Sequence, residues 1–140
     1  MNPTDAQIQQ EIREVDKYYQ LGLTSFHQKK YNEAIDLFTK SLETCVYIQA
    51  LDSYMARALC FMITERYQEA IDDFTDPLLP PFNKNSDNLD ADINRFTNVG
   101  FAYYKLGKYV EAIDFYEKVL ILDPSDKDAK LMLPKLKFLV

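Results

Sequence analysis

The sequence predicts an all-α solenoid built from antiparallel helical hairpins, and three observations support this prediction. One phrase, Tyr-x-Glu-Ala-Ile-Asp-x-aromatic, occurs three times, beginning at Tyr31, Tyr67 and Tyr109. A small residue precedes each copy at a constant distance: Gly22, Ala58 and Gly100. Apolar side chains around each copy recur at helical spacing. Repetition of a short unit at such intervals is typical of a repeat array, in contrast to a single layered domain.

The third copy shows most clearly why each unit should be a pair of helices. Apolar residues at helical spacing run from Phe96 to Tyr104 and again from Tyr109 to Leu120. Gly107 lies between the two stretches, and glycine readily adopts the left-handed conformation that ends a helix. Asp123-Pro124 closes the unit. Small residues on both helices should let the pair approach closely, while the large aromatic side chains fill the remaining space.

These residues together resemble the tetratricopeptide-repeat (TPR) family. The first helices carry a bulky residue, then Gly or Ala, then an aromatic, at Tyr18/Gly22, Tyr54/Ala58/Phe61 and Phe96/Gly100/Tyr103. The second helices carry Tyr-x-x-Ala-x-x-x-aromatic. The resemblance implies a right-handed solenoid of three repeats with a C-terminal capping helix. The copies are spaced more widely than the family period of about 34 residues, which predicts insertions between repeats.

Taken in order, the chain is expected to divide into six segments. Residues 1–14 should extend the first helix, which Thr4 and Gln7 begin as a capping box. The segments that follow are a first repeat over 15–46, a second over 51–79, a Pro- and Asn-rich insertion loop over 80–91, a third repeat over 93–126 and a capping helix over 127–140.

Three local expectations follow from residue types at particular positions. The stretch from Val46 to Asp52 contains neither Gly nor Pro, so the flanking helices should extend around a compact turn. The last helix should begin at Ser125, with Asp128 three residues later. Pro134 should kink that helix.

Composition argues against several classes of function. The formal charge of −6 and the pI near 4.7 disfavour nucleic acid and anionic lipid as partners. Cys45, Cys60 and the single His27 have no metal-ligand or catalytic spacing, and no phosphate-binding glycine loop occurs. We therefore expect no enzymatic activity, cofactor or metal. Without a signal sequence or an apolar run long enough to insert into a membrane, the chain is expected to be cytoplasmic or nuclear.

The resemblance implies a binding surface. In this family the first helices of successive hairpins line a concave groove that takes a peptide or helix. Carried over by aligned positions, the groove residues here are Tyr19, Leu23, Phe26, Met55, Leu59, Met62, Asn94, Thr97, Asn98, Phe101 and Tyr104. The implied function is a protein–protein interaction module that binds an apolar or amphipathic segment of a partner protein. For Phe26, Met62 and Tyr104, inter-repeat core is an equal alternative.

A co-chaperone that binds the acidic tails of heat-shock chaperones is disfavoured. In the family, that clamp needs Lys, Asn, Asn, Lys and Arg at five positions of the first helices. The corresponding residues here are Tyr19, Leu23, Ala56, Asn94 and Asn98. None of them matches, and a groove without cations cannot pair with a multiply charged carboxylate tail.

Two alternatives concern other parts of the chain. A structural subunit or adaptor of a larger multiprotein complex could be held through the loop over 77–90 and the C-terminal end, with Leu78, Leu79 and Phe82 as docking residues. A regulated module could instead fill its own groove with residues 1–13 or 138–140. The sequence identifies neither the partner nor the pathway.

Overall fold

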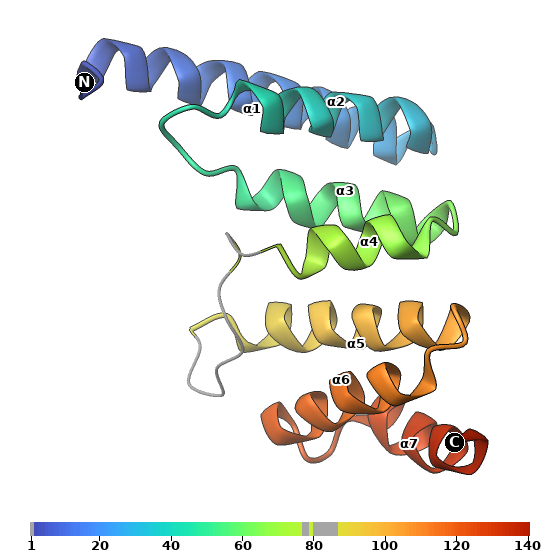
Figure 1. Cartoon of the computed structure of the whole chain (residues 1–140). Coiled ribbons are helices and arrows are strands. Elements are labelled where there is room, and N and C mark those ends of the chain that lie inside the picture. The colour runs from blue at the N-terminus through green and yellow to red at the C-terminus, as the bar shows by residue number, and fades with distance from the viewer. Residues whose placement is uncertain (1, 77–78, 80–86) are drawn as a thin grey trace. The chain divides into compact units, whose positions relative to one another are not determined.

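The computed structural model describes residues 2–76, 79 and 87–140, and every regular element in that part of the chain is a helix. The helices are α1 (Asp5–His27), α2 (Tyr31–Thr44), α3 (Leu51–Ile63), α4 (Tyr67–Phe74), α5 (Leu89–Lys105), α6 (Tyr109–Leu122) and α7 (Lys127–Leu139) (Figure 1). The contacts divide the chain into two compact units, Met1–Glu65 with α1 to α3 and Arg66–Val140 with α4 to α7. Each unit is described by itself.

In the first unit, α1 and α2 form an antiparallel hairpin (Figure 1). The predicted capping box begins α1: the Gln7 backbone N–H donates to Thr4 Oγ1 at 3.2 Å, and the Thr4 N–H donates to Gln7 Oε1 at 2.8 Å. Gly22 and Phe38 set the distance between the two helices, because a Cβ at Gly22 would lie 2.5 Å from Cε1 of the buried Phe38 ring. The small residue predicted at this position is therefore required by close packing.

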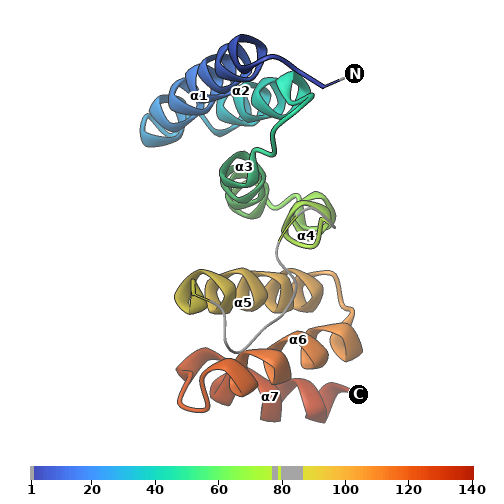
Figure 2. The same cartoon turned by 90° about the vertical axis from the view of Figure 1, so that its left-hand side faces the viewer.

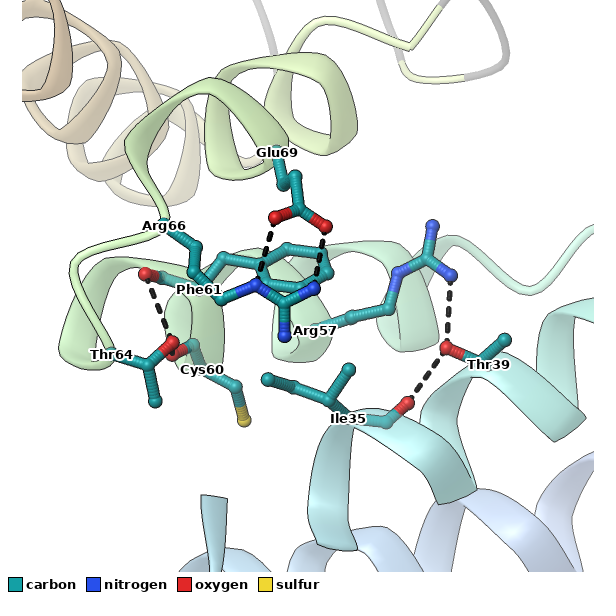
Figure 3. Close-up of polar contacts among 8 residues, drawn as sticks. All are labelled: Ile35, Thr39, Arg57, Cys60, Phe61, Thr64, Arg66 and Glu69. Atoms are coloured by element: carbon teal, nitrogen blue, oxygen red, sulfur yellow. Dashed lines mark hydrogen bonds and ion pairs between the residues drawn. The ribbon is translucent and has the colours of Figure 1, made fainter. Parts of the chain in front are cut away.

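Polar contacts fix α3 against α2 and α1. Ser41 Oγ on α2 lies 2.8 Å from Ser53 Oγ on α3, and it donates to the carbonyl of Val15 on α1 at 3.1 Å. Nearby, Arg57 Nη1 donates to Thr39 Oγ1 at 3.1 Å, and that hydroxyl donates to the Ile35 carbonyl (Figure 3). These bonds connect all three helices of the first unit.

The segment between α2 and α3 differs from the expectation. The two helices do not extend around a compact turn: α2 ends at Thr44, α3 begins at Leu51, and residues 45–50 are not helical. The absence of Gly and Pro did not keep this stretch helical, and a side chain far away in the sequence binds its backbone.

That side chain is Glu11 on α1. Its carboxylate accepts the backbone N–H groups of Val46, Tyr47 and Ile48 at 2.7, 2.8 and 2.8 Å. Glu11 is buried, with 7 % of its surface exposed. A buried carboxylate is tolerated when its oxygens accept hydrogen bonds. Desolvation works to raise the pKa of Glu11, but the three N–H donors together lower it below the usual value.

In the second unit, α4 packs on α5, α5 on α6, and α6 on α7; the α5–α7 part is clearest in Figure 2. The predicted glycine turn between α5 and α6 is present, with Gly107 at φ 75°. The start of α5 differs from the expectation, since it begins at Leu89 and includes residues assigned to the insertion loop. Asp90 and Asp92 in its first turn favour a helix start there through the helix dipole.

The last helix, α7, begins at Lys127, and its N-cap lies one residue later than the expected Ser125. Asp126, not Ser125, caps α7, because its Oδ2 accepts the backbone N–H of Ala129 at 2.9 Å. The Ser125 hydroxyl donates instead to Asp123 Oδ1 at 2.7 Å. The helix then continues through Pro134 to Leu139.

A single hydrophobic cluster joins α5, α6 and α7. Its buried members are Phe96, Ala112, Tyr116, Val119, Leu122, Ala129, Leu133 and Leu136. Since α7 contributes three of these side chains, it covers the apolar face that α6 would otherwise expose.

Candidate peptide-binding groove of the first unit

The predicted groove residues of α1 and α3 line a real depression. A cavity of about 210 Å³ lies between these helices. Its walls are formed by Tyr19, Leu23, Phe26, Phe38, Asp52, Met55, Ala56 and Leu59. Five of the six groove residues that the sequence predicted in this unit are thus brought together, and Met62 is the one that does not line the cavity.

A second cavity of about 380 Å³ adjoins the first. It is lined by Ile12, Val15, Asp16, Tyr19, Ile48, Gln49, Ala50, Leu51, Asp52 and Ser53. Tyr19 and Asp52 line both cavities, and the surface formed by the residues of the two cavities is here called the α1–α3 groove. From Ile12 to Phe26 along α1, this groove is about 20 Å long.

Aromatic packing fixes the two aromatic side chains of the groove. Tyr19 lies against the Phe38 ring, with 5.8 Å between centroids, and Phe26 meets Tyr31 edge-on at 5.6 Å. Both side chains remain half-buried, so each is in part core and in part groove wall. Phe26 thus packs on Tyr31 and also lines the cavity, and its role in binding stays a prediction.

Leu59 is the most accessible apolar side chain among the residues that line the 210 Å³ cavity. It is 38 % exposed although it lies on α3, a helix whose other face is buried. Its neighbours in the cavity, Leu23 and Met55, are half-buried. An apolar side chain left open within a concave apolar surface is typical of an interaction site.

Two carboxylates give the groove a negative charge. Asp16 lies six residues before Gly22, and Asp52 lies six residues before Ala58, so both occupy the same position of the repeat. Desolvation, followed by the Asp52 and Asp16 charges, raises the pKa of Tyr19. No Lys or Arg is among the residues that line either cavity.

In the second unit, the predicted polar groove residues are bonded within α5. Thr97 Oγ1 donates to the Ile93 carbonyl at 2.8 Å, and Asn98 Nδ2 donates to the Asn94 carbonyl at 2.9 Å. These side chains are therefore less available to a ligand than the sequence alone indicates.

The aromatic groove residues of the second unit form a cluster. Phe101 lies 6.4 Å from Tyr67 and 6.2 Å from Tyr104, and Tyr104 lies 6.1 Å from Tyr109. Lys135 of α7 lies over the Tyr104 ring at 5.6 Å. Phe101 is 38 % exposed, like Leu59. That the two units share one groove stays a prediction.

Of the three predicted docking residues in the loop, Leu79 lies within the described part of the chain. Leu79 is 7 % exposed, so its side chain is not presented for docking as the sequence suggested. Leu78 and Phe82 lie outside the described residues.

Sequence reasoning missed Glu11, whose carboxylate holds the segment that borders the second cavity. The signal was present: Glu11, Val15, Gly22 and Ser25 are the buried residues of α1, and they follow helical spacing along one face. A glutamate on that face has to find polar partners in the interior.

The cysteines have the character expected of small buried side chains. Cys45 is half-buried and Cys60 is buried, and both are free. Burial raises the pKa of Cys60 to about 11, which disfavours the reactive thiolate. Within the described part of the chain, no group of three or more His, Cys, Asp or Glu side chains could hold a metal ion. Nor does that part contain a helix that is long and apolar enough to cross a membrane.

Helical hairpins that repeat one sequence phrase define a helical-repeat protein, and in the first unit α1 and α3 line a concave surface. The sequence matches the tetratricopeptide-repeat family over residues 17–45 and again over residues 94–126. The chain is a tetratricopeptide-repeat protein, and its predicted all-α fold class is confirmed.

Similar proteins support this assignment. The second TPR domain of human RPAP3, solved with the HSP70 peptide SGPTIEEVD, is 27 % identical with a TM-score of 0.70, covering 91 % of this chain and 98 % of that one. The first TPR of Spaghetti (RPAP3), solved with the HSP90 peptide SRMEEVD, is 25 % identical with a TM-score of 0.69, covering 90 % and 92 %.

A longer relative is also similar in sequence. Serine/threonine-protein phosphatase T of Trypanosoma brucei brucei is 31 % identical over 122 residues, which are 85 % of this chain. The chain spans only 23 % of that phosphatase.

Proposed function

We propose that the protein is a non-enzymatic interaction module, and that the α1–α3 groove binds an apolar or amphipathic segment of a partner protein. The observation that carries this proposal is the concave cavity that contains Tyr19, Leu23, Phe26, Met55 and Leu59. Methionine and leucine side chains adapt to different apolar ligands. An adaptor or scaffold role in a multiprotein complex would use the same surface. Met62 of the first unit and the α5 residues of the second unit are further proposed contact residues, each within its own unit: Asn94, Thr97, Asn98, Phe101 and Tyr104.

The ligand that we propose differs from the chaperone peptides bound by the two RPAP3 domains. Those peptides end in the acidic sequence EEVD. Here the α1–α3 groove contains Asp16 and Asp52 and is not lined by a Lys or Arg. Like charges oppose an acidic tail, so a co-chaperone function through this groove is disfavoured.

The test is a paired affinity capture from cell extract, read by mass spectrometry. Leu59→Asp places a charge in the apolar cavity and should abolish partner capture while helicity by circular dichroism stays unchanged. Leu21→Asp is the matched control, because Leu21 is also an exposed leucine of the first unit and lines neither cavity of the groove.

Two results would contradict the proposal. Partners retained equally by wild type and Leu59→Asp would show that the groove is not the site. A loss of helicity in Leu59→Asp would show that Leu59 is core. Captured segments are then synthesised and titrated, and the Met55 methyl resonance should shift on binding.

The C-terminal end supports a second candidate function, that of a structural subunit held through α7. Phe138 is 89 % exposed, and Leu131 and Val140 are also exposed. If this surface is the main contact, partners should survive Leu59→Asp and be lost in Phe138→Asp.

A further inference from the structure

We propose that the α1–α3 groove selects a cationic segment, in which one or two apolar anchor side chains are flanked by Lys or Arg. This inference rests on the proposed function and adds the chemistry of the partner. The groove supplies an apolar floor through Leu23, Met55 and Leu59 and carboxylates beside it through Asp16 and Asp52.

The position of the two carboxylates is the first argument. Asp52 and Asp16 both line the 380 Å³ cavity, and both side chains are exposed. Helix stability accounts for Asp52, which lies in the first turn of α3. It does not account for Asp16, which lies in the middle of α1, where the helix dipole has little effect. The same repeat position thus carries an acid twice on one concave surface.

The neighbouring cations are the second argument, because they lie against other partners. Lys17 and Lys40 lie over the Tyr18 ring at 5.6 and 6.0 Å. Arg57 donates to Thr39 on α2 (Figure 3). Asp16 accepts a bond at 3.3 Å from the neutral Gln20 side chain. Among the described residues, neither Asp16 nor Asp52 forms an ion pair with a Lys or Arg, and a bound Lys or Arg would supply that partner.

The size of the groove limits the ligand. A groove about 20 Å long takes about six residues of extended chain or about four helical turns. Charge complementarity at its centre would set the register of that segment, and the apolar anchors would supply most of the affinity.

The experiment compares three synthetic peptides that share one apolar pattern and carry Lys, Gln or Glu at every polar position. Binding of the full chain to each fluorescent peptide is measured by anisotropy at low salt. The Lys peptide should bind about tenfold tighter than the Gln peptide, and the Glu peptide should bind weakest, in accordance with Coulomb attraction near a surface.

Two double variants test whether the preference for the Lys peptide arises from the groove carboxylates. Asp16→Asn with Asp52→Asn should reduce the preference for Lys over Gln to about threefold or less. The control variant Glu33→Gln with Asp36→Asn also removes two negative charges, but from exposed positions on α2 that line neither cavity. It should keep most of the preference for the Lys peptide over the Gln peptide.

The outcomes separate this inference from the proposed function. Equal binding of the three peptides, lost in Leu59→Asp, would overturn charge selection and leave the groove as the site. Failure of all three peptides to bind, or binding that survives Leu59→Asp, would overturn both. If sedimentation shows a dimer that Leu59→Asp dissociates, the occupant is a second copy and the cationic partner is overturned.

Discussion

Lys29, Glu65 and Gly107 show how a single residue completes the turn after a first helix. Each stands two positions before the Tyr of the recurring phrase, and each has positive φ: 61°, 61° and 75°. For residues with a Cβ, this left-handed conformation costs about 1–2 kcal/mol. Gly107 adopts it without that strain, so the first two copies carry a cost that the third does not.

We predict that Lys29→Gly stabilises the protein by about 1 kcal/mol, because glycine relieves the left-handed strain despite its greater freedom in the unfolded chain. Thermal unfolding should show a midpoint about 3 °C higher. Lys30→Gly is the control, since Lys30 has φ −92° and gains nothing from glycine. An unchanged or lower midpoint for Lys29→Gly would contradict the strain argument.

At the scale of elements, α1 does more than pair with α2. The Glu11 carboxylate binds three consecutive backbone N–H groups of the segment that joins α2 to α3. This carboxylate must be ionised to accept all three N–H groups. Because the folded-state pKa lies below the ordinary value of 4.5, the contribution of Glu11 to stability is fully present above that pH. It is lost as the pH falls through the lowered pKa.

We therefore predict that Glu11→Gln destabilises the protein at neutral pH and flattens the loss of stability in acid. Thermal midpoints of wild type and Glu11→Gln should converge as the pH falls below the ordinary glutamate value of 4.5. Glu14→Gln changes an exposed carboxylate on the same helix, which accepts only from Gln10, and should track the wild type. A constant difference between Glu11→Gln and wild type at every pH would contradict this account.

The elements also show where sequence reasoning succeeds and fails. The α1 start and the glycine turn were predictable because a capping box and a left-handed glycine act within three or four residues. The segment over 45–50 was not, because its backbone is bound by a residue about 35 positions earlier. Asp126 and Ser125 are adjacent residues that both favour an N-cap, so composition alone could not choose between them.

The site was predictable only in part for a related reason. Tyr19, Leu23 and Leu59, which repeat alignment assigned to one surface, line the same cavity, while their role in binding stays a prediction. Repeat alignment could not show that Thr97 and Asn98 bond to their own helix. Thr and Asn side chains are prone to such local bonds, which compete with ligand binding, but alignment of repeats does not take them into account.

At the scale of the whole molecule, the charge of −6 adds a long-range attraction for a cationic partner. This attraction should speed association, whereas Asp16 and Asp52 act at short range in the bound state.

We predict that raising the salt from about 0.05 M to about 0.5 M weakens binding of the Lys peptide and leaves the Gln peptide unaffected. Asp16→Asn with Asp52→Asn should flatten the salt dependence more than Glu33→Gln with Asp36→Asn does. If both double variants showed the same change of affinity with salt, the salt dependence would come from the net charge of the protein and not from the groove carboxylates.

The hydrogen bonds of Glu11 to the segment after α2 limit where the first repeat can be cut from the rest of the chain. Repeat proteins are commonly recombined as interchangeable cassettes, cut at the first conserved position of each repeat. A cassette beginning at Val15, where the repeat pattern starts, would omit Glu11 and leave the N–H groups of Val46, Tyr47 and Ile48 without their acceptor. The smallest transplantable first repeat therefore includes the turns of α1 that carry no repeat signature.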